Sequence, residues 1–181
     1  MTRQESFNRL RRLIVLVMLG CLMFLSDFLM EFLPNIHLVG VLIVAYTRVY
    51  RGGALIAVYV YVFLNGLYGG FATWWIPYLY VWTVLWAGVM LLPRRLPRKA
   101  GNVVCTVVCA LHGLAFGTIY APAQALLFGF SPQQTLAWIA AGLPWDVIHG
   151  VGNLLLSVVL LPLVDLLQRL ERKFTVLPEN H

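Results

Sequence analysis

Charged residues are scarce in this chain of 181 residues: they make up 11% of it, whereas hydrophobic residues make up 61%. Soluble globular domains usually carry about a quarter charged residues. A water-soluble core does not need so much apolar sequence, so the composition excludes an ordinary soluble domain. We therefore expect one integral membrane domain over residues 1–181, all-α because a membrane-spanning helix satisfies its own backbone hydrogen bonds.

Cysteine is also scarce, and its positions argue against a disulfide or zinc framework. Cys21, Cys105 and Cys109 all lie in apolar segments, and no pair has the spacing of a zinc finger. Cys105, Cys109 and His112 share one helical stripe, but small buried cysteines are ordinary packing residues. We expect no metal site.

The chain lacks the motifs of catalysis and of nucleotide binding. It has no serine or cysteine nucleophile motif and no glycine-rich loop that could hold phosphates. The net charge of +6 suggests nucleic acid at first sight, but the basic residues form short clusters beside apolar runs, which indicates membrane topology instead. We expect neither an enzyme nor a cofactor, and any uphill transport must draw its energy from a partner.

All thirteen Lys and Arg residues fall into four short clusters, and each gap between clusters can hold two membrane crossings. Cytoplasmic loops carry an excess of Lys and Arg, so this pattern predicts that every cluster and both termini lie in the cytoplasm. The expected location is the bacterial plasma membrane. The clusters are Arg3, Arg9, Arg11 and Arg12; Arg48 and Arg51; Arg94, Arg95, Arg98 and Lys99; and Arg169, Arg172 and Lys173.

Six membrane spans are the simplest number that keeps all four basic clusters on one side of the membrane. The first apolar stretch has no A-x-A-like cleavage site and is long enough to span, so we expect a retained helix and not a signal peptide. Residues 121–134 are expected to form a partly helical cap on the outer face. The expected spans are about 13–32, 37–50, 54–69, 76–92, 103–120 and 143–167.

The stretch GLPWDVIHGVGN (residues 142–153) is the richest in polar groups. Pro144 suits the first turn of a helix, and Asp146 would then lie at its positive end. Asp146, His149 and Asn153 are spaced three and four apart, so they share a helical face that must look into protein or a cavity. The face is either part of a ligand site or a structural cluster that ties helices together.

Other polar and aromatic residues are expected near the outer side. Asp27 and Glu31 share one face near the outer end of the first helix, either as ligand contacts or as a wetted acidic edge. Tryptophan and tyrosine crowd residues 74–86, and Trp82 lies deeper than an interfacial belt explains. Flat rings of this kind suit an apolar or flat ligand. The candidate binding residues are Asp27, Glu31, Asn35, His37, Asn65, Trp74, Trp75, Tyr78, Trp82, Tyr120, Gln124, Asp146, His149 and Asn153.

Over nearly its whole length the chain resembles the substrate-binding (S) component of an energy-coupling factor (ECF) vitamin transporter. The resemblance rests on size, six expected spans and four stretches: LPNIH (33–37), ALIAVYVYVFLNG (54–66), LHGLAFG (111–117) and GLPWD followed by IHG (142–150). It implies tight binding of a vitamin or similar micronutrient at the outer side. It also implies docking on a scaffold membrane subunit that carries two ATPases.

The first helix departs from the family pattern, because it offers only Gly20 and Cys21 where small residues usually mediate docking. A structural membrane protein of the cell-shape type, without a ligand, is the alternative. No Lys or Arg is expected outside, so a multiply anionic ligand would lack a partner. Cobalamin-like, riboflavin-like or base-like compounds are favoured.

Overall fold

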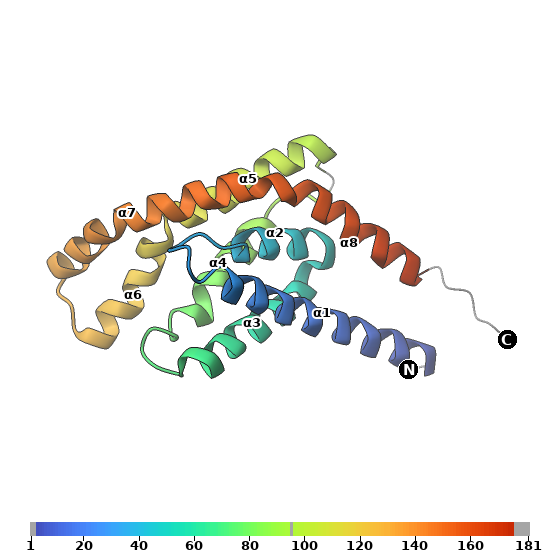
Figure 1. Cartoon of the computed structure of the whole chain (residues 1–181), viewed down its shortest axis with the longest axis horizontal. Helices are drawn as coiled ribbons and strands as arrows, with labels where there is room; N and C mark the ends of the chain where they lie inside the picture. Colours follow the sequence, from blue (N-terminus) through green and yellow to red (C-terminus); the bar gives the residue numbers. More distant parts are fainter. Residues whose placement is uncertain (1–2, 95, 176–181) are drawn as a thin grey trace.

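The computed structural model describes residues 3–94 and 96–175, and every regular element in these ranges is a helix (Figure 1). This confirms the all-helical fold class. Two short 3-10 turns, η1 (Arg51–Gly53) and η2 (Ser157–Val159), join longer helices. The α-helices are α1 (Arg3–Leu29), α2 (Val39–Tyr50), α3 (Ala54–Gly69), α4 (Tyr78–Met90), α5 (Arg98–Leu114), α6 (Phe116–Phe128), α7 (Pro132–Leu156) and α8 (Leu160–Thr175).

Four runs of helix are long and apolar enough to cross a membrane: Arg3–Leu29, Val39–Gly69, Arg98–Phe128 and Pro132–Lys173. The apolar helix α4 is shorter. The chain is therefore a helical membrane protein. Arg51 has a φ of 52°, and at this point the second run reverses, so that α2 and α3 run in opposite directions (Figure 1). Six spans stay a prediction.

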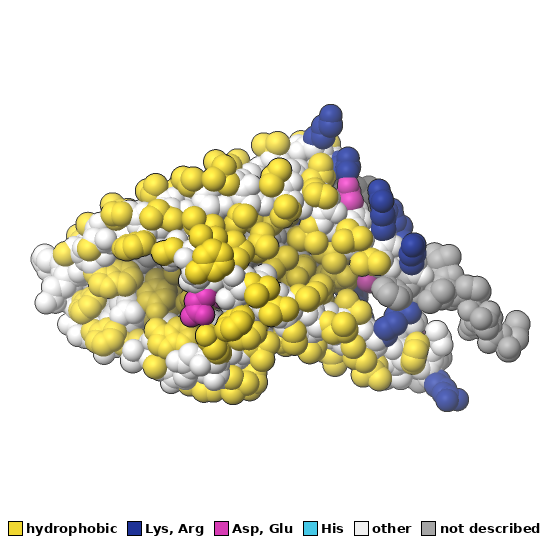
Figure 2. Space-filling model, viewed as in Figure 1, with side chains coloured by type: hydrophobic (Ala, Val, Ile, Leu, Met, Phe, Trp, Pro, Cys, Tyr) yellow, Lys and Arg dark blue, Asp and Glu magenta, His cyan; other side chains and the backbone are white. Residues whose placement is uncertain are grey.

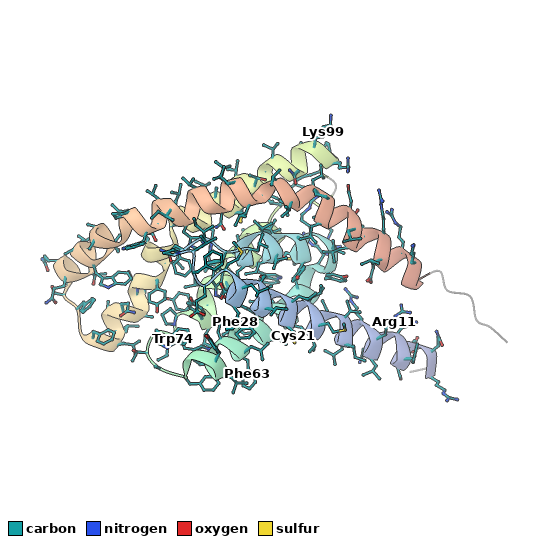
Figure 3. The ribbon with its side chains drawn as sticks, viewed as in Figure 1. Arg11, Cys21, Phe28, Phe63, Trp74 and Lys99 are labelled. Atoms are coloured by element: carbon teal, nitrogen blue, oxygen red, sulfur yellow. The ribbon has the colours of Figure 1, made fainter. Side chains whose placement is uncertain are left out.

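Basic side chains gather at one end of the molecule, where the start of α1 and the end of α8 also lie (Figures 1 and 2). The α2–α3 turn, the α4–α5 connection and the far part of α8 bring their basic residues to this basic end. Arg11 and Lys99 are labelled at this end (Figure 3), and Arg48 and Arg94 line one cavity with Arg98, the neighbour of Lys99, whereas Arg95 lies outside the described residues. The α3–α4 and α6–α7 connections lie at the opposite end (Figure 1).

The short helix α2 forms the centre of the bundle. Nine of its residues are buried, among them Ile43, Tyr46 and Thr47, and they face all sides of the helix. A helix that is apolar all round belongs in a protein interior. The α1, α3, α4, α5 and α8 helices contact it. The short second apolar segment is therefore enclosed by other helices.

Glycine sets the closest helix approaches. A Cβ atom on Gly113 of α5 would lie 2.8 Å from the backbone of Gly150 on α7, so these two helices touch backbone to backbone. Small residues allow such contacts in membrane bundles. Gly20 of α1 is used in the same way, since a Cβ there would lie 2.7 Å from the Ala57 carbonyl oxygen on α3.

The expected start of the last long helix was wrong. Pro144 lies inside α7, which begins twelve residues earlier at Pro132. Ser131 accepts a hydrogen bond from the Gln134 N–H and the Gln134 side chain accepts one from the Ser131 N–H, which is a capping box followed by proline in the first turn. The cap expected at 121–134 is mostly the continuous end of α6, which passes through Pro122.

Candidate functional site

Trp82 on α4 is fully buried and lies at the centre of a cluster of rings. The rings come from α3, α4, α5, α6, α7 and the segment before α2, and their centroids lie 5.4–6.4 Å from that of Trp82. We call this set the Trp82 cluster. Its members are His37, Tyr61, Tyr78, Trp82, His112, Phe116 and His149.

Several buried polar atoms in and beside this cluster have no hydrogen-bond partner. They are His37 Nδ1, Trp82 Nε1, His112 Nδ1, His149 Nε2 and Asn153 Oδ1. A buried polar atom left unpaired costs about 1–3 kcal/mol, and such atoms are few in native proteins. The indole N–H can only donate, the amide oxygen can only accept, and a neutral histidine can do either. Together they can recognise a polar ring.

The neighbouring carboxylate of Asp146, in contrast, accepts a hydrogen bond, which one N–H shares between its two oxygens. Both of its oxygens accept the backbone N–H of Gly117, at 2.9 and 3.1 Å. Gly117 lies in the first turn of α6, where the helix dipole favours a negative charge. A Cβ on Gly117 would lie 2.7 Å from the carboxylate, so only glycine leaves room for it. Asp146 therefore caps α6 and does not open onto the cluster.

Asn153 lies one turn after His149 on α7, and it has one hydrogen-bonded and one unpaired polar atom. Its Nδ2 donates to the Cys109 carbonyl oxygen on α5 at 3.1 Å, while its Oδ1 is buried and unpaired. The face formed by Asp146, His149 and Asn153 is buried throughout, as the spacing predicts. Through Asn153 and Asp146 this face connects α7 to α5 and α6 by hydrogen bonds. Its third residue, His149, belongs to the Trp82 cluster.

A second group of predicted residues lines a small cavity between α1 and α3. The cavity has a volume of about 100 Å³ and is lined by Phe24, Asp27, Phe28, Glu31, Asn65 and Tyr68. Asp27 accepts a hydrogen bond from Tyr61 at 2.9 Å. Because the Tyr61 ring also packs on Trp82, this tyrosine joins the acidic cavity to the Trp82 cluster.

Further aromatic residues extend from the cluster toward the surface. Trp74 contacts the Tyr78 ring, and its carbonyl oxygen accepts a hydrogen bond from Tyr120 at 2.7 Å. Figure 3 labels Trp74 at the end of the molecule away from the basic residues. Figure 2 shows the surface hollowed there, between the α6–α7 end and acidic side chains near the end of α1.

The structure separates the remaining predicted residues from the cluster. Trp75 donates its Nε1–H to the Val62 carbonyl oxygen at 2.8 Å, and Asn65 donates to the Tyr61 carbonyl oxygen. Asn35 is exposed and donates to the Trp145 carbonyl oxygen. Gln124 lies beside the Tyr120 side chain, outside the cluster.

The sequence reasoning missed three members of the cluster: Tyr61, His112 and Phe116. His112 contacts the Val81 carbonyl oxygen through Nε2 at 3.0 Å. His112 and Phe116 are four residues apart in the LHGLAFG stretch, so their shared face was a usable signal. Among the described residues, no group of three His, Cys, Asp or Glu side chains could hold a metal ion.

No family model, curated protein or solved structure matches this chain.

Proposed function

We propose that the chain is the substrate-binding membrane subunit of an ECF-type importer, and that it binds a vitamin-like molecule with a flat ring system. One observation carries the proposal: five buried polar atoms without partners lie in and beside the Trp82 cluster. A bound heterocycle that presents both donors and acceptors would satisfy them and stack on the rings.

The charges near the cluster narrow the ligand class. The described Lys and Arg residues lie at the basic end, so a multiply anionic ligand has no partner near Trp82. Asp27 and Glu31 are the carboxylates of the small acidic cavity. The favoured ligand is an uncharged or singly cationic ring compound of the cobalamin-like, riboflavin-like or base-like kind, with any cationic group directed toward Asp27.

Entry to the cluster requires movement at the end opposite the basic residues. Trp82 is fully buried, whereas Trp74, Tyr78 and Tyr120 are half-buried and lie between it and the surface. Opening of the α3–α4 connection (residues 70–77) would expose the rings without disturbing α2. In this proposal the ligand enters from outside the cell, and the loop closes over it.

Transport itself would depend on partners. The sequence offers no ATP site, so a scaffold membrane subunit with two ATPases would supply the energy. The exposed face of α1, which carries Leu13, Val17 and Leu25, is apolar and available for a scaffold or for lipid. Gly20 is already packed on α3 and does not serve docking.

A binding screen tests this function. The protein purified in mild detergent is extracted and its small molecules identified by mass spectrometry, and thermal shifts are then recorded against a vitamin panel. We expect one ring compound to raise the melting temperature of the native protein but not of the Trp82→Ala variant. If no small molecule co-purifies and no vitamin shifts the melting temperature, the importer proposal is contradicted and the alternative, a structural membrane protein of the cell-shape type, is favoured.

The orientation is tested separately in intact cells, by labelling single cysteines placed in a background from which Cys21, Cys105 and Cys109 have been removed by substitution. The positive-inside rule places Leu96 in the cytoplasm and Thr73 outside. We expect an impermeant thiol reagent to label Thr73→Cys and to leave Leu96→Cys unlabelled. The reverse pattern would overturn the proposed topology.

A further inference from the structure

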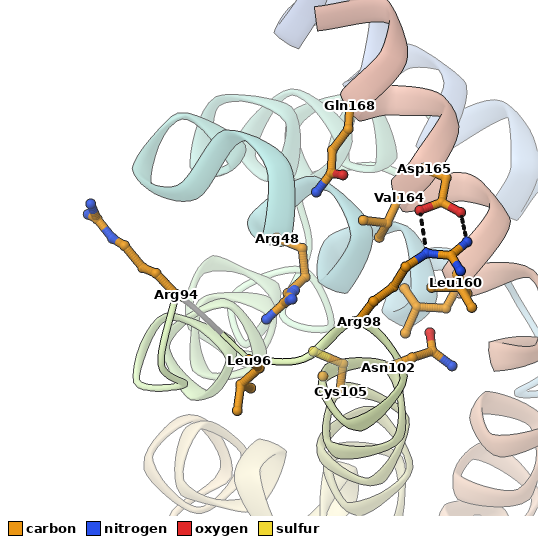
Figure 4. A pocket seen from close by; sticks show the side chains of 12 residues that line it. Arg48, Arg94, Leu96, Arg98, Asn102, Cys105, Leu160, Val164, Asp165 and Gln168 are labelled. Atoms are coloured by element: carbon orange, nitrogen blue, oxygen red, sulfur yellow. Dashed lines mark hydrogen bonds and ion pairs between the residues drawn. The ribbon is translucent and has the colours of Figure 1, made fainter. Parts of the chain in front are cut away.

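A larger cavity lies at the basic end, where α2, α5 and α8 meet, and it has no part in the proposed ligand site. Its volume is about 230 Å³. The polar side chains that line it come from α2, the α4–α5 connection, α5 and α8 (Figure 4). They are Arg48, Arg94, Arg98, Asn102, Asp165 and Gln168.

The side chains that line this cavity include more positive than negative charges. Asp165 is its one carboxylate, and both oxygens of Asp165 accept hydrogen bonds from the Arg98 guanidinium. Arg48 is half-buried and reaches into the cavity from α2 (Figure 4). Arg48 takes no part in the Arg98–Asp165 salt bridge. Arg48 therefore adds a positive charge to the cavity beyond the one that is paired with Asp165, and Arg94 adds a second.

The backbone of α5 makes room for this guanidinium. A Cβ atom on Gly101 would lie 3.0 Å from the Arg48 Nη2, so the arginine head lies directly over a glycine. Asn102 of α5 and Gln168 of α8 add amide groups to the cavity lining. Guanidinium and amide N–H groups are the donors that bind phosphate oxygens.

Besides its polar side chains, α8 contributes apolar side chains to the cavity lining. Leu160, Leu161 and Val164 of α8 line it, and Leu160 is fully buried. A ligand here meets a cation at one end and hydrocarbon at the other. Basic pockets between membrane helices on the cytoplasmic side are suited to lipid head groups.

We propose that this cavity binds a phosphate group, and that an anionic phospholipid of the leaflet at the basic end carries it. The Arg48 guanidinium supplies the charge, and Asn102 and Gln168 orient the phosphate oxygens. The acyl chains lie along the apolar face of α8. This site does not depend on the identity of the small molecule bound near Trp82.

Native mass spectrometry and melting temperatures in nanodiscs test the proposal. The protein is compared in phosphatidylglycerol and phosphatidylcholine, and in detergent with millimolar inorganic phosphate. We expect phosphatidylglycerol to be retained on the protein and to raise its melting temperature more than phosphatidylcholine does. Arg48→Gln should weaken that retention roughly tenfold, the loss expected for one charge-assisted contact.

Two further variants make the test decisive. Lys99→Gln removes an exposed positive charge from the same end, outside the cavity lining, and should leave phosphatidylglycerol retention unchanged. Asn102→Asp is nearly isosteric and places a negative charge in the cavity wall, so it should reduce retention even if Arg48→Gln fails to fold. Equal protection by inorganic phosphate alone would overturn the lipid source and keep the phosphate site. Equal retention of phosphatidylglycerol by the native protein and Asn102→Asp would overturn the site.

Discussion

The α6–α7 contact and the Trp82 cluster share one face of α7, yet they treat buried polar groups in opposite ways. At the contact, both oxygens of Asp146 are bonded to Gly117. In the cluster, three residues further along, His149 Nε2 is equally enclosed and has no partner. A buried polar group that is hydrogen-bonded within the protein has a structural role. A buried polar group without a partner needs another explanation, such as a ligand or an ordered water. Burial alone therefore does not identify a binding residue.

The largest expected effect comes from removing the centre of the cluster. Trp82→Ala deletes a fully buried ring that contacts six others, and it should lower the free energy of unfolding by about 3–5 kcal/mol. Trp82→Phe keeps most of the volume and removes the unpaired N–H. Thermal unfolding in detergent should show a much smaller loss for phenylalanine. Equal losses would mean that the indole nitrogen has a partner after all.

Substitutions at the α6–α7 contact between Asp146 and Gly117 should lower the free energy of unfolding less than Trp82→Ala does. They should leave ligand affinity unchanged. Asp146→Ala leaves the Gly117 N–H buried without an acceptor, which costs about 1–3 kcal/mol. Asp146→Asn retains one acceptor oxygen and should cost less. Both variants are measured by thermal unfolding, with Asp27→Asn as a control for a carboxylate outside this contact. No change in Asp146→Ala would contradict the capping role.

The link between the acidic cavity and the cluster is a single hydrogen bond. Tyr61→Phe removes the donor to Asp27 and keeps the ring packed on Trp82, so the expected loss is about 0.5–1.5 kcal/mol. Tyr68→Phe is a matched control on the same helix, because Tyr68 donates to the exposed Glu31. Its melting temperature should change less than that of Tyr61→Phe. The reverse order would contradict the link.

The smallest expected change in stability is at His149. His149→Phe keeps a flat ring among its neighbours and removes a buried nitrogen that has no partner, so the free energy of unfolding should stay within about 1 kcal/mol of the native value. Thermal unfolding without ligand provides this comparison. If His149→Phe lowers the free energy of unfolding as much as Asp146→Ala does, His149 also has a structural role.

Composition and basic clusters predicted the helical membrane fold and the gathering of Lys and Arg at one end, because both depend on the bilayer and not on detailed packing. The spacing of Asp146, His149 and Asn153 likewise predicted a buried face. The partner of Asp146 could not be predicted, since it depends on α6 starting at Phe116, across a tertiary contact. Pro144 was misleading because a proline inside a membrane-type helix does not have to end it. The Ser131–Gln134 capping box was the better signal for the start of α7.

Ligand affinity of Asp146→Asn and His149→Phe, measured for the same ring compound by isothermal titration in detergent, tests the central claim most directly. The two residues are neighbours on α7, but only His149 presents an unpaired atom to the cluster. We predict that Asp146→Asn lowers the melting temperature and keeps near-native affinity, whereas His149→Phe keeps the melting temperature and binds about tenfold or more weakly, as expected for one lost hydrogen bond to a buried group. Native affinity in His149→Phe would contradict the assignment of the Trp82 cluster as the binding site.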